Sequence, residues 1–559
     1  MINSILALIR VLVKTTRLRA PKTLVLLLFA STIAGPCYSQ EIELLLGGKV
    51  VKAKVLRNAA AIPFDKEVID QLHEKGVREY HTIESPGEPD LAIFKMDGGQ
   101  KRRFDKVIKD HNLNSDPEDN VRSSYVLEYG NTENILKNEF SVAFVESATQ
   151  PEIDAFLQKN GLEVIGRNAF FKNQFNVRFI NKHAIDALLA LPKDSIVRYF
   201  EPNFIQIQKR KPSGTNNPRA FIPDRSILPP MPNDPLLNLQ WHLIKVNADG
   251  QLAPIPSTID SWNVTTGNGS ITIAILDDGV DVNHPDLKDK IVNAYNAFDT
   301  LEEQSPNRYE PHGTACAGIA AASTNNGIGV AGIAWNCKIM PVKIFGLNES
   351  NEPITSADAV QRGIMKAVQA GAKILNCSWG GGLPAGKVND AIDYAVKNSC
   401  IMVFAAGNNG IEGLEYPANL AKDLDVISVN SVNESDDLKV TNSDGEGWGS
   451  NWGDGLTLTA PGIHICTTDL TRPGRGYSSD SEYFHNFNGT SSSAPLVSGA
   501  IGLLLSIDPS LTPAQVKELL SISCDDLGER GYDPKFGHGR LNTFKLMSNA
   551  KLARPSEIK

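Results

Sequence analysis

Several features that would place this chain in a special class of protein are missing from it. Neither glycine (45 residues) nor proline (32 residues) is in excess over 559 residues, which excludes a collagen-like or low-complexity chain. The formal charge of -9 comes without a long basic run, which argues against nucleic acid as the main partner. The remaining composition is that of an ordinary globular protein, and the length predicts two or three folded units.

Cysteine is also scarce. The chain has seven cysteines, at positions 37, 316, 337, 377, 400, 466 and 524, and no two of them form a Cys-x-x-Cys pair. A structural zinc site or a thioredoxin-like redox motif therefore has no support. Export from the cell would permit disulfides, but the scattered spacing does not reveal a pairing.

The first forty residues differ from the rest of the chain. Basic residues between Lys14 and Lys22 precede the apolar run Thr23–Gly35, and small or polar residues follow as far as Ser39. This order is typical of a secretion signal, and the run is shorter than the span of about 20 residues that crosses a bilayer. We predict a signal peptide over residues 1–39, and a mature form that is secreted or periplasmic and has no stable membrane span. The additional apolar piece Met1–Val13 leaves an uncleaved anchor as the alternative.

Three zones follow the predicted signal peptide. Residues 40–125 mix short strand-like runs with a helical stretch and do not specify a fold. In residues 126–208 the pattern predicts strand 140–145, helix 149–161, strands 163–171 and 174–180, helix 182–190 and strand 196–200. This order is typical of an α+β, ferredoxin-like unit, although any small binding module is an alternative. Residues 209–234 are rich in proline and begin with Lys209-Arg210-Lys211, which is typical of an exposed, protease-sensitive linker.

From residue 235 to residue 559, apolar strands alternate with helices. Strands are predicted at 271–276, 338–344, 373–377, 401–405, 426–429 and 456–459, and helices at about 313–322, 355–371, 386–398 and 494–507. The alternation predicts an α/β domain in three layers, a mostly parallel sheet with helices on both faces. Functional groups in such folds gather at the carboxyl ends of the strands.

Three short motifs carry the residues for covalent catalysis. Asp277 ends a buried strand before Asp278-Gly279, His312 begins a helix of small residues, and Ser491 lies at the start of another helix. Each has a purely structural explanation when taken alone, as a turn or capping residue. Together they supply a hydroxyl nucleophile, an imidazole that accepts its proton, and a carboxylate that orients the imidazole.

The motifs Asp277-Asp-Gly, His312-Gly-Thr-x-Cys-Ala-Gly and Gly489-Thr-Ser-x-Ser-Ala-Pro resemble those of the subtilisin-like serine proteases. The resemblance extends from about Asp234 to Leu546. It implies that Ser491 is the nucleophile, His312 the base and Asp277 the orienting acid. The motifs also resemble those of the kexin/furin branch, whereas the chain length and the lack of a downstream domain are not typical of that branch. Asp278 stands where many members have Ser or Thr.

The resemblance implies further site residues. Asn408, at the end of Val403–Asn408, would help to bind the oxyanion. Ser378, Trp379 and Gly380 would bind the substrate backbone on one side, and Gly346–Ser350 on the other. Glu412 and Glu415 lie near the expected floor of the specificity pocket, where basic specificity would need an acid, but solvated loop carboxylates are the alternative.

A structural calcium site is also implied by the resemblance. Asp286 and Asn326 would supply a carboxylate and an amide oxygen, and the carbonyl groups of Ile328 and Val330 would complete the set. No cofactor is expected for the chemistry.

The sequence therefore predicts a secreted serine endopeptidase that acts on proteins or peptides. It would be made as a self-processing precursor, in which the pro-domain at 126–208 inhibits the peptidase domain at 235–559. A catalytically silent homologue that binds other proteins is the alternative, and another serine hydrolase such as an esterase is a third possibility.

Overall fold

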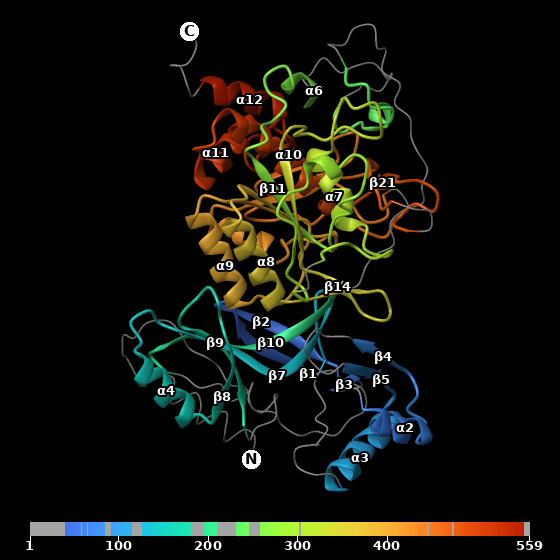
Figure 1. The fold of residues 1–559 in the computed structure, drawn as a ribbon, viewed down its shortest axis with the longest axis vertical. Helices are drawn as coiled ribbons and strands as arrows, with labels where there is room; N and C mark the ends of the chain where they lie inside the picture. Colours follow the sequence, from blue (N-terminus) through green and yellow to red (C-terminus); the bar gives the residue numbers. More distant parts are fainter. Residues whose placement is uncertain are drawn as a thin grey trace. The chain divides into compact units, whose positions relative to one another are not determined.

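The computed structural model describes residues 40–56, 59–63, 65–83, 91–114, 126–180, 194–208, 231–244, 258–300, 303–443, 446–471 and 475–552 (Figure 1). The predicted signal peptide (1–39), the predicted helix at 182–190 and most of the predicted linker (209–234) lie outside these residues.

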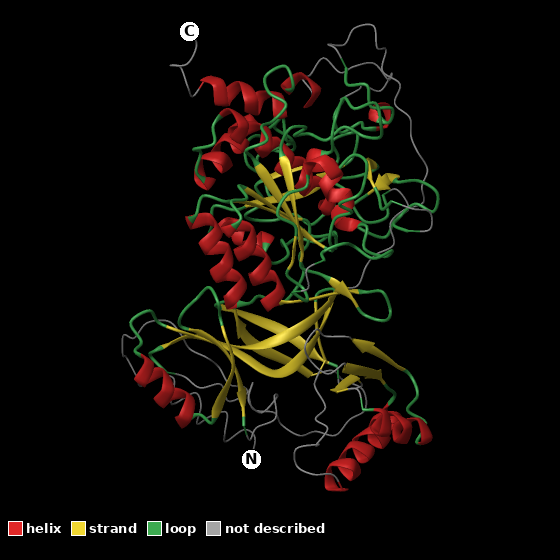
Figure 2. Ribbon diagram, in the orientation of Figure 1, coloured by secondary structure: helices red, strands yellow, loops and turns green. Residues whose placement is uncertain are grey.

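A seven-stranded parallel sheet forms the centre of the carboxyl-terminal part of the chain (Figure 2). Its strand order is β12 (Tyr295–Asn296), β13 (Lys338–Lys343), β11 (Thr272–Asp277), β16 (Ile374–Cys377), β17 (Ile401–Ala405), β18 (Ile427–Val432) and β19 (Leu458–Pro461). Six of these strands were predicted from the sequence, because strands that are buried on both faces are apolar throughout.

Two apolar cores cover the two faces of this sheet. Ile273 and Ile275 of β11 join one core, whereas Ala274 and Leu276 join the other, since successive side chains of a strand point to opposite faces. The first core packs against α7 (His312–Ala321) and α10 (Thr490–Ile507), and the second against α8 (Ala357–Gln369) and α9 (Gly386–Lys397). These layers confirm the predicted α/β architecture.

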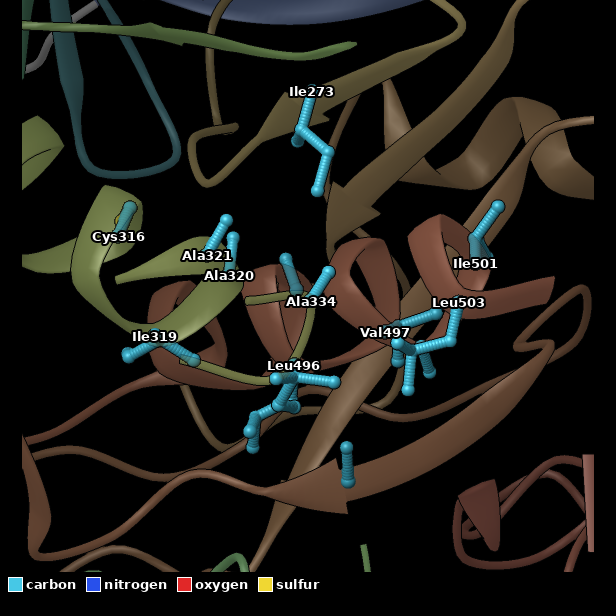
Figure 3. Close-up of a cluster of buried hydrophobic side chains, with 14 of the residues drawn as sticks. Ile273, Cys316, Ile319, Ala320, Ala321, Ala334, Leu496, Val497, Ile501 and Leu503 are labelled. Atoms are coloured by element: carbon cyan, nitrogen blue, oxygen red, sulfur yellow. The ribbon is translucent and has the colours of Figure 1, made fainter. Parts of the chain in front are cut away.

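Small residues allow α7 and α10 to pack closely in the first core. Figure 3 shows Ala320 and Ala321 of α7 in one apolar cluster with Leu496 and Val497 of α10. A Cβ atom at Gly499 of α10 would lie only 2.8 Å from the Ala320 carbonyl oxygen. Among the described helices, α10 is the one that is long and apolar enough to cross a membrane, but 89% of it is buried within this protein. Further elements on this part of the chain are α6 (Thr258–Ser261), α11 (Pro513–Ser523), α12 (Thr543–Leu552) and the hairpin of β20 (Ile465–Thr468) and β21 (Tyr483–Phe487).

A second large sheet is antiparallel and combines strands from residues 40–208 with two strands from residues 346–356. Its order is β1 (Gln40–Leu46), β2 (Lys49–Val55), β6 (Val126–Tyr129), β7 (Thr132–Phe144), β10 (Val197–Gln208), β15 (Pro353–Ser356) and β14 (Gly346–Leu347). Strand β10 pairs with β7 on one side and with β15 on the other, where Ile205 faces Ser356 and Ile207 faces Ile354. The sequence did not predict this pairing, because apolar periodicity gives strand position but not strand partners.

Residues 126–208 form their own apolar core next to this sheet. Strands β8 (Leu162–Arg167) and β9 (Gln174–Phe179) extend from β7, so the local order is β8, β9, β7, β10. Helix α4 (Gln150–Lys159) begins with a capping box between Thr149 and Glu152. The predicted second helix lies outside the described residues, so the ferredoxin-like assignment stays a prediction.

Residues 40–125, whose fold the sequence did not specify, contribute to two structures. Strands β1 and β2 join the antiparallel sheet, whereas β3 (Ala59–Pro63), β5 (Leu91–Lys95) and β4 (Tyr80–Ile83) form a small sheet of their own. Helices α2 (Lys66–Glu74) and α3 (Gly98–Asn114) share an apolar core with it, which includes Leu72, Phe94 and Phe104.

None of the six cysteines in the described part of the chain forms a disulfide. They are Cys316, Cys337, Cys377, Cys400, Cys466 and Cys524, and all but Cys524 are buried.

Candidate active site

The predicted Asp–His pair is formed where β11 ends and α7 begins. The ring nitrogen Nδ1 of His312 lies 2.8 Å from Oδ1 and 3.0 Å from Oδ2 of Asp277. Burial of the ring by itself lowers the pKa of His312. The charge of Asp277, the hydrogen bond to it, and the neighbouring Cys316 and Tyr477 together outweigh burial, and the pKa lies well above its ordinary value. The Asp277 side chain is only 3% exposed, so the carboxylate is shielded from water and holds the imidazole in one orientation.

The neighbouring acid, Asp278, contacts the backbone of α7. Its carboxylate accepts the backbone N–H of His312 at 3.2 Å and that of Gly313 at 2.7 Å. A carboxylate in this place satisfies N–H groups that a helix start leaves without partners within the helix. Asp278 therefore positions the helix that carries His312, a role that the sequence did not indicate.

Ser491 is the second residue of α10, which begins four residues earlier than predicted. Its hydroxyl donates to the Ser378 carbonyl oxygen at 2.9 Å, and the Ser378 hydroxyl donates to the Ser491 carbonyl oxygen at 2.9 Å. Ser491 is buried, with 8% of the residue exposed. The bond from Ser378 to its carbonyl oxygen holds the backbone of Ser491 in place. Rotation about its Cα–Cβ bond would turn the hydroxyl away from Ser378 and toward another acceptor.

Asn408 follows β17 and lies beside the start of α10. Its side-chain oxygen accepts the backbone N–H of Thr490 at 2.9 Å and the Thr490 hydroxyl at 3.0 Å. These two bonds fix the amide with its oxygen toward Thr490. The amide nitrogen is therefore the end that can serve as a donor to an anion next to Ser491.

All of these groups line one cavity of about 480 Å³. Asp277, His312, Asn408 and Ser491 lie on its wall together with Ser378, Trp379 and Gly380. The cavity lies at the carboxyl ends of β11, β16 and β17, as expected for a sheet of this kind.

Other expected pocket residues are placed differently. Phe345 and Pro353 line the cavity among the described residues, rather than Gly346–Ser350 between them. Glu415 lies on the wall, whereas the Glu412 side chain is exposed and its residue bridges to Trp452.

Three residues from the amino-terminal part of the chain also line this cavity, and none of them was predicted as a site residue. Gln208, the last residue of β10, donates from its side chain to the Gly380 carbonyl oxygen at 3.2 Å. Thr132 donates to the Gly381 carbonyl oxygen at 3.2 Å, and Asn131 donates to the side-chain oxygen of Asn409. The predicted substrate edge at Gly380 is thus contacted by the segment that precedes the linker.

The predicted calcium ligands lie together, away from the cavity. Asn326 donates to Oδ1 of Asp286 at 2.8 Å, and the backbone N–H of Val330 donates to Oδ2 at 3.0 Å. Asp234, which was not predicted, accepts the backbone N–H of Asn325 at 2.8 Å. Burial raises the pKa of both carboxyl groups, and for Asp234 the charge of Asp286 adds to the effect.

This donor set fits a hard cation. Two buried carboxylates whose proton affinity is raised by burial are stabilised by positive charge, and oxygen donors from Asp and Asn side chains suit Ca²⁺. The backbone N–H of Ile328 donates to the Asn326 side-chain oxygen at 3.1 Å. Asp234 gave no sequence signal because it lies next to the proline-rich linker, far along the chain from Asp286.

Comparison with known proteins identifies the family of sequences that this chain resembles. The profile of the subtilase family matches residues 268–539. Thermitase of Thermoactinomyces vulgaris is 31% identical over 51% of this chain and 91% of its own length. A calcium-dependent protease of Nostoc sp. (strain PCC 7120) is 30% identical over 57% of this chain and 52% of its own length.

Among solved structures, the crystal structure of fervidolysin from Fervidobacterium pennivorans, a keratinolytic enzyme related to subtilisin, superposes with a TM-score of 0.57 at 25% identity. The match covers 76% of this chain and 61% of fervidolysin. It therefore extends beyond the residues that match the family profile.

Proposed function

The chain belongs to the subtilase family and is a subtilisin-like serine endopeptidase, and we propose that it cleaves peptide bonds through Asp277, His312 and Ser491. The observation that carries this assignment is the bond between His312 and the buried Asp277, in a cavity that also contains Ser491 and Asn408. A silent homologue is less well supported, because all four positions have residues that are competent for catalysis. An esterase is also less well supported, because an extended backbone edge at Ser378–Gly380 suits a peptide.

The mechanism follows from the chemistry of these groups. Rotation of the Ser491 hydroxyl toward Nε2 of His312 lets the ring accept its proton while the oxygen attacks the peptide carbonyl. Asp277 stabilises the resulting imidazolium through Nδ1. The Asn408 amide and the backbone N–H of Ser491 bind the oxyanion. His312 then protonates the leaving amine, and water releases the acyl group by the reverse sequence of proton transfers.

We further propose that the chain is exported by the segment at 1–39 as a precursor, and that residues 40–208 are its inhibitory pro-segment. Strand β10 pairs with β15 and ends at Gln208, which bonds to Gly380. Glu201 of β10 accepts the N–H of Gly386, the first residue of α9, at 2.6 Å. The pairing of β10 with β15 and the bond from the start of α9 to Glu201 support tight binding of the pro-segment to the peptidase domain.

Self-processing should fail when the nucleophile is removed. The Ser491→Ala precursor is expected to keep its pro-segment, whereas the wild-type chain is cut between about Phe204 and Asp234. Amino-terminal sequencing and intact mass of both proteins, made in a host that lacks other proteases, measure this difference. Added separately, the segment 40–208 should inhibit the mature enzyme. Normal processing of Ser491→Ala would show that another protease makes the cut.

We also propose that Asp234, Asp286 and Asn326 bind a structural calcium ion, in keeping with the calcium-dependent protease to which the chain is similar. A ligand that binds only the folded state stabilises it by about 2.7 kcal/mol at 100 times its Kd. Excess EGTA at matched ionic strength should therefore lower the melting temperature of the mature enzyme by several degrees, as measured by calorimetry. Asp286→Asn should make the melting temperature insensitive to EGTA. An unchanged wild-type value in EGTA would contradict the calcium site.

A further inference from the structure

The active-site cavity is acidic beyond what the catalytic chemistry requires. Glu415 and Glu446 line it in addition to Asp277 and Asp278, and no lysine or arginine is among the described residues on its wall. An excess of one charge around a concave site attracts ligands of the opposite charge and disfavours ligands of the same charge.

The two additional carboxylates have different surroundings. Glu446 accepts the indole N–H of Trp448 at 2.7 Å and bonds from the Asn488 amide at 2.8 and 3.0 Å, so both of its oxygens already accept hydrogen bonds that fix a loop. Asn488 lies three residues before Ser491, so Glu446 contacts the segment that leads to the nucleophile. Glu415 lies beside the predicted substrate edge, next to Gly380 and Gly381.

The backbone around Glu415 leaves space for its carboxylate. A Cβ atom at Gly407 would lie 2.7 Å from Cδ of Glu415, and one at Gly381 would lie 3.0 Å from Oε2. Any side chain at Gly407 would therefore displace the carboxylate. The Asn409 amide donates to Oε1 of Glu415 and holds it in this position.

The position of this carboxylate relative to the nucleophile determines what it can contact. Ser378 shares hydrogen bonds with Ser491, and Gly380 and Gly381, which continue the same segment, lie next to Glu415. A peptide that binds along Ser378–Gly380 with its carbonyl at Ser491 directs the adjacent side chain between this edge and Gly407. That side chain meets the Glu415 carboxylate.

We propose that Glu415 makes the enzyme selective for lysine or arginine at the residue whose carbonyl is attacked. This inference rests on the proposed function, since it concerns the substrate of the same site. The ammonium or guanidinium group of the substrate forms a charge-assisted hydrogen bond with the carboxylate. The precursor sequence is consistent with this preference, because Gln208 is followed by Lys209, Arg210 and Lys211.

The preference is measured with the mature enzyme, obtained by processing of the full-length chain, on peptides that differ only in the residue before the cleaved bond. The wild-type kcat/KM for Lys and Arg peptides should exceed that for the Leu peptide by about 10- to 100-fold, the effect of one hydrogen bond to a charged group. Glu415→Gln should lower the ratio of kcat/KM for the Lys and Arg peptides to that for the Leu peptide to about one, since the amide carries no charge. Glu415→Lys should reverse it, so that a Glu peptide is cleaved faster than a Lys peptide.

Two further variants, Glu412→Gln and Glu446→Gln, test whether the basic preference depends on Glu415 rather than on a nearby carboxylate. Glu412→Gln, in the same loop but with an exposed side chain, should retain the basic preference, and labelling by a fluorophosphonate probe verifies that each variant is folded and active. A preference for Leu in the wild type, or a basic preference that survives Glu415→Gln and is lost in Glu446→Gln, would overturn the inference while leaving the endopeptidase assignment in place. Failure to cleave any peptide or to bind the probe would overturn the proposed function and this inference with it.

Discussion

Replacing Ser491 by alanine should lower kcat by about 10⁶-fold, a magnitude known from a subtilisin, and His312→Ala should cost nearly as much. The reason is that the hydroxyl is a weak nucleophile without the imidazole, and the imidazole has no proton to accept without the hydroxyl. The double variant should therefore be only slightly slower than either single variant. Steady-state hydrolysis of a peptide, together with fluorophosphonate labelling, measures both effects.

The neighbouring residue Ser492 provides a matched control for this experiment. It is fully buried in α10, and its hydroxyl has no hydrogen-bond partner in the described part of the chain. Ser492→Ala removes the same atom one residue away and should retain full activity and labelling. Turnover by Ser491→Ala at the wild-type rate, or loss of labelling only in Ser492→Ala, would show that the wrong serine has been assigned.

Local sequence patterns predicted the parallel sheet well. Apolar strands such as β11 and β17 are buried on both faces, and this burial leaves a continuous signal in the sequence that needs no knowledge of partners. The helix that carries Ser491 was placed too late, because Thr490, Ser491 and their neighbours favour caps and turns in isolation. Within the structure they are buried against other elements, and packing outweighs their weak preference.

Contacts between distant segments were not predictable from the sequence. The pairing of β10 with β15 joins residues about 150 positions apart, and nothing in either strand specifies the other. The same holds for Asp234, which approaches Asn325 only after folding. The fold of residues 40–125 was missed for a related reason, since its strands belong to two different sheets.

Side-chain chemistry was predictable to the extent that residue type limits function. Serine, histidine and aspartate in three motifs indicated one kind of catalysis, and the structure places them at one cavity. Their order along the chain could not separate the roles of Asp277 and Asp278, which are adjacent acids of equal charge. The family resemblance implied Asp277 as the acid, and the directions of the two carboxylates, toward the ring and toward the helix backbone, give a physical distinction between them.

That distinction predicts unequal effects of the two amide substitutions. Asp277→Asn should lower kcat by about 10⁴-fold, since an amide can donate to Nδ1 and favour the wrong tautomer of His312. Asp278→Asn retains an oxygen that can accept one of the N–H groups of α7. It should cost about 1 kcal/mol of stability, as for a weakened helix cap, and less than about 10-fold in kcat.

The pH dependence of kcat/KM provides a second way to distinguish the two acids. Neutral His312 is the active form, and the Asp277 carboxylate raises its pKa, so the wild-type rate falls as the pH drops through that raised value. Removing the charge in Asp277→Asn lowers the pKa of His312, and the acidic limb of the profile should move to lower pH. Asp278→Asn should move it less, because its carboxylate bonds to backbone N–H groups rather than to the ring. A larger loss of kcat and a larger shift in Asp278→Asn would make Asp278 the catalytic acid and Asp277 the residue that positions α7.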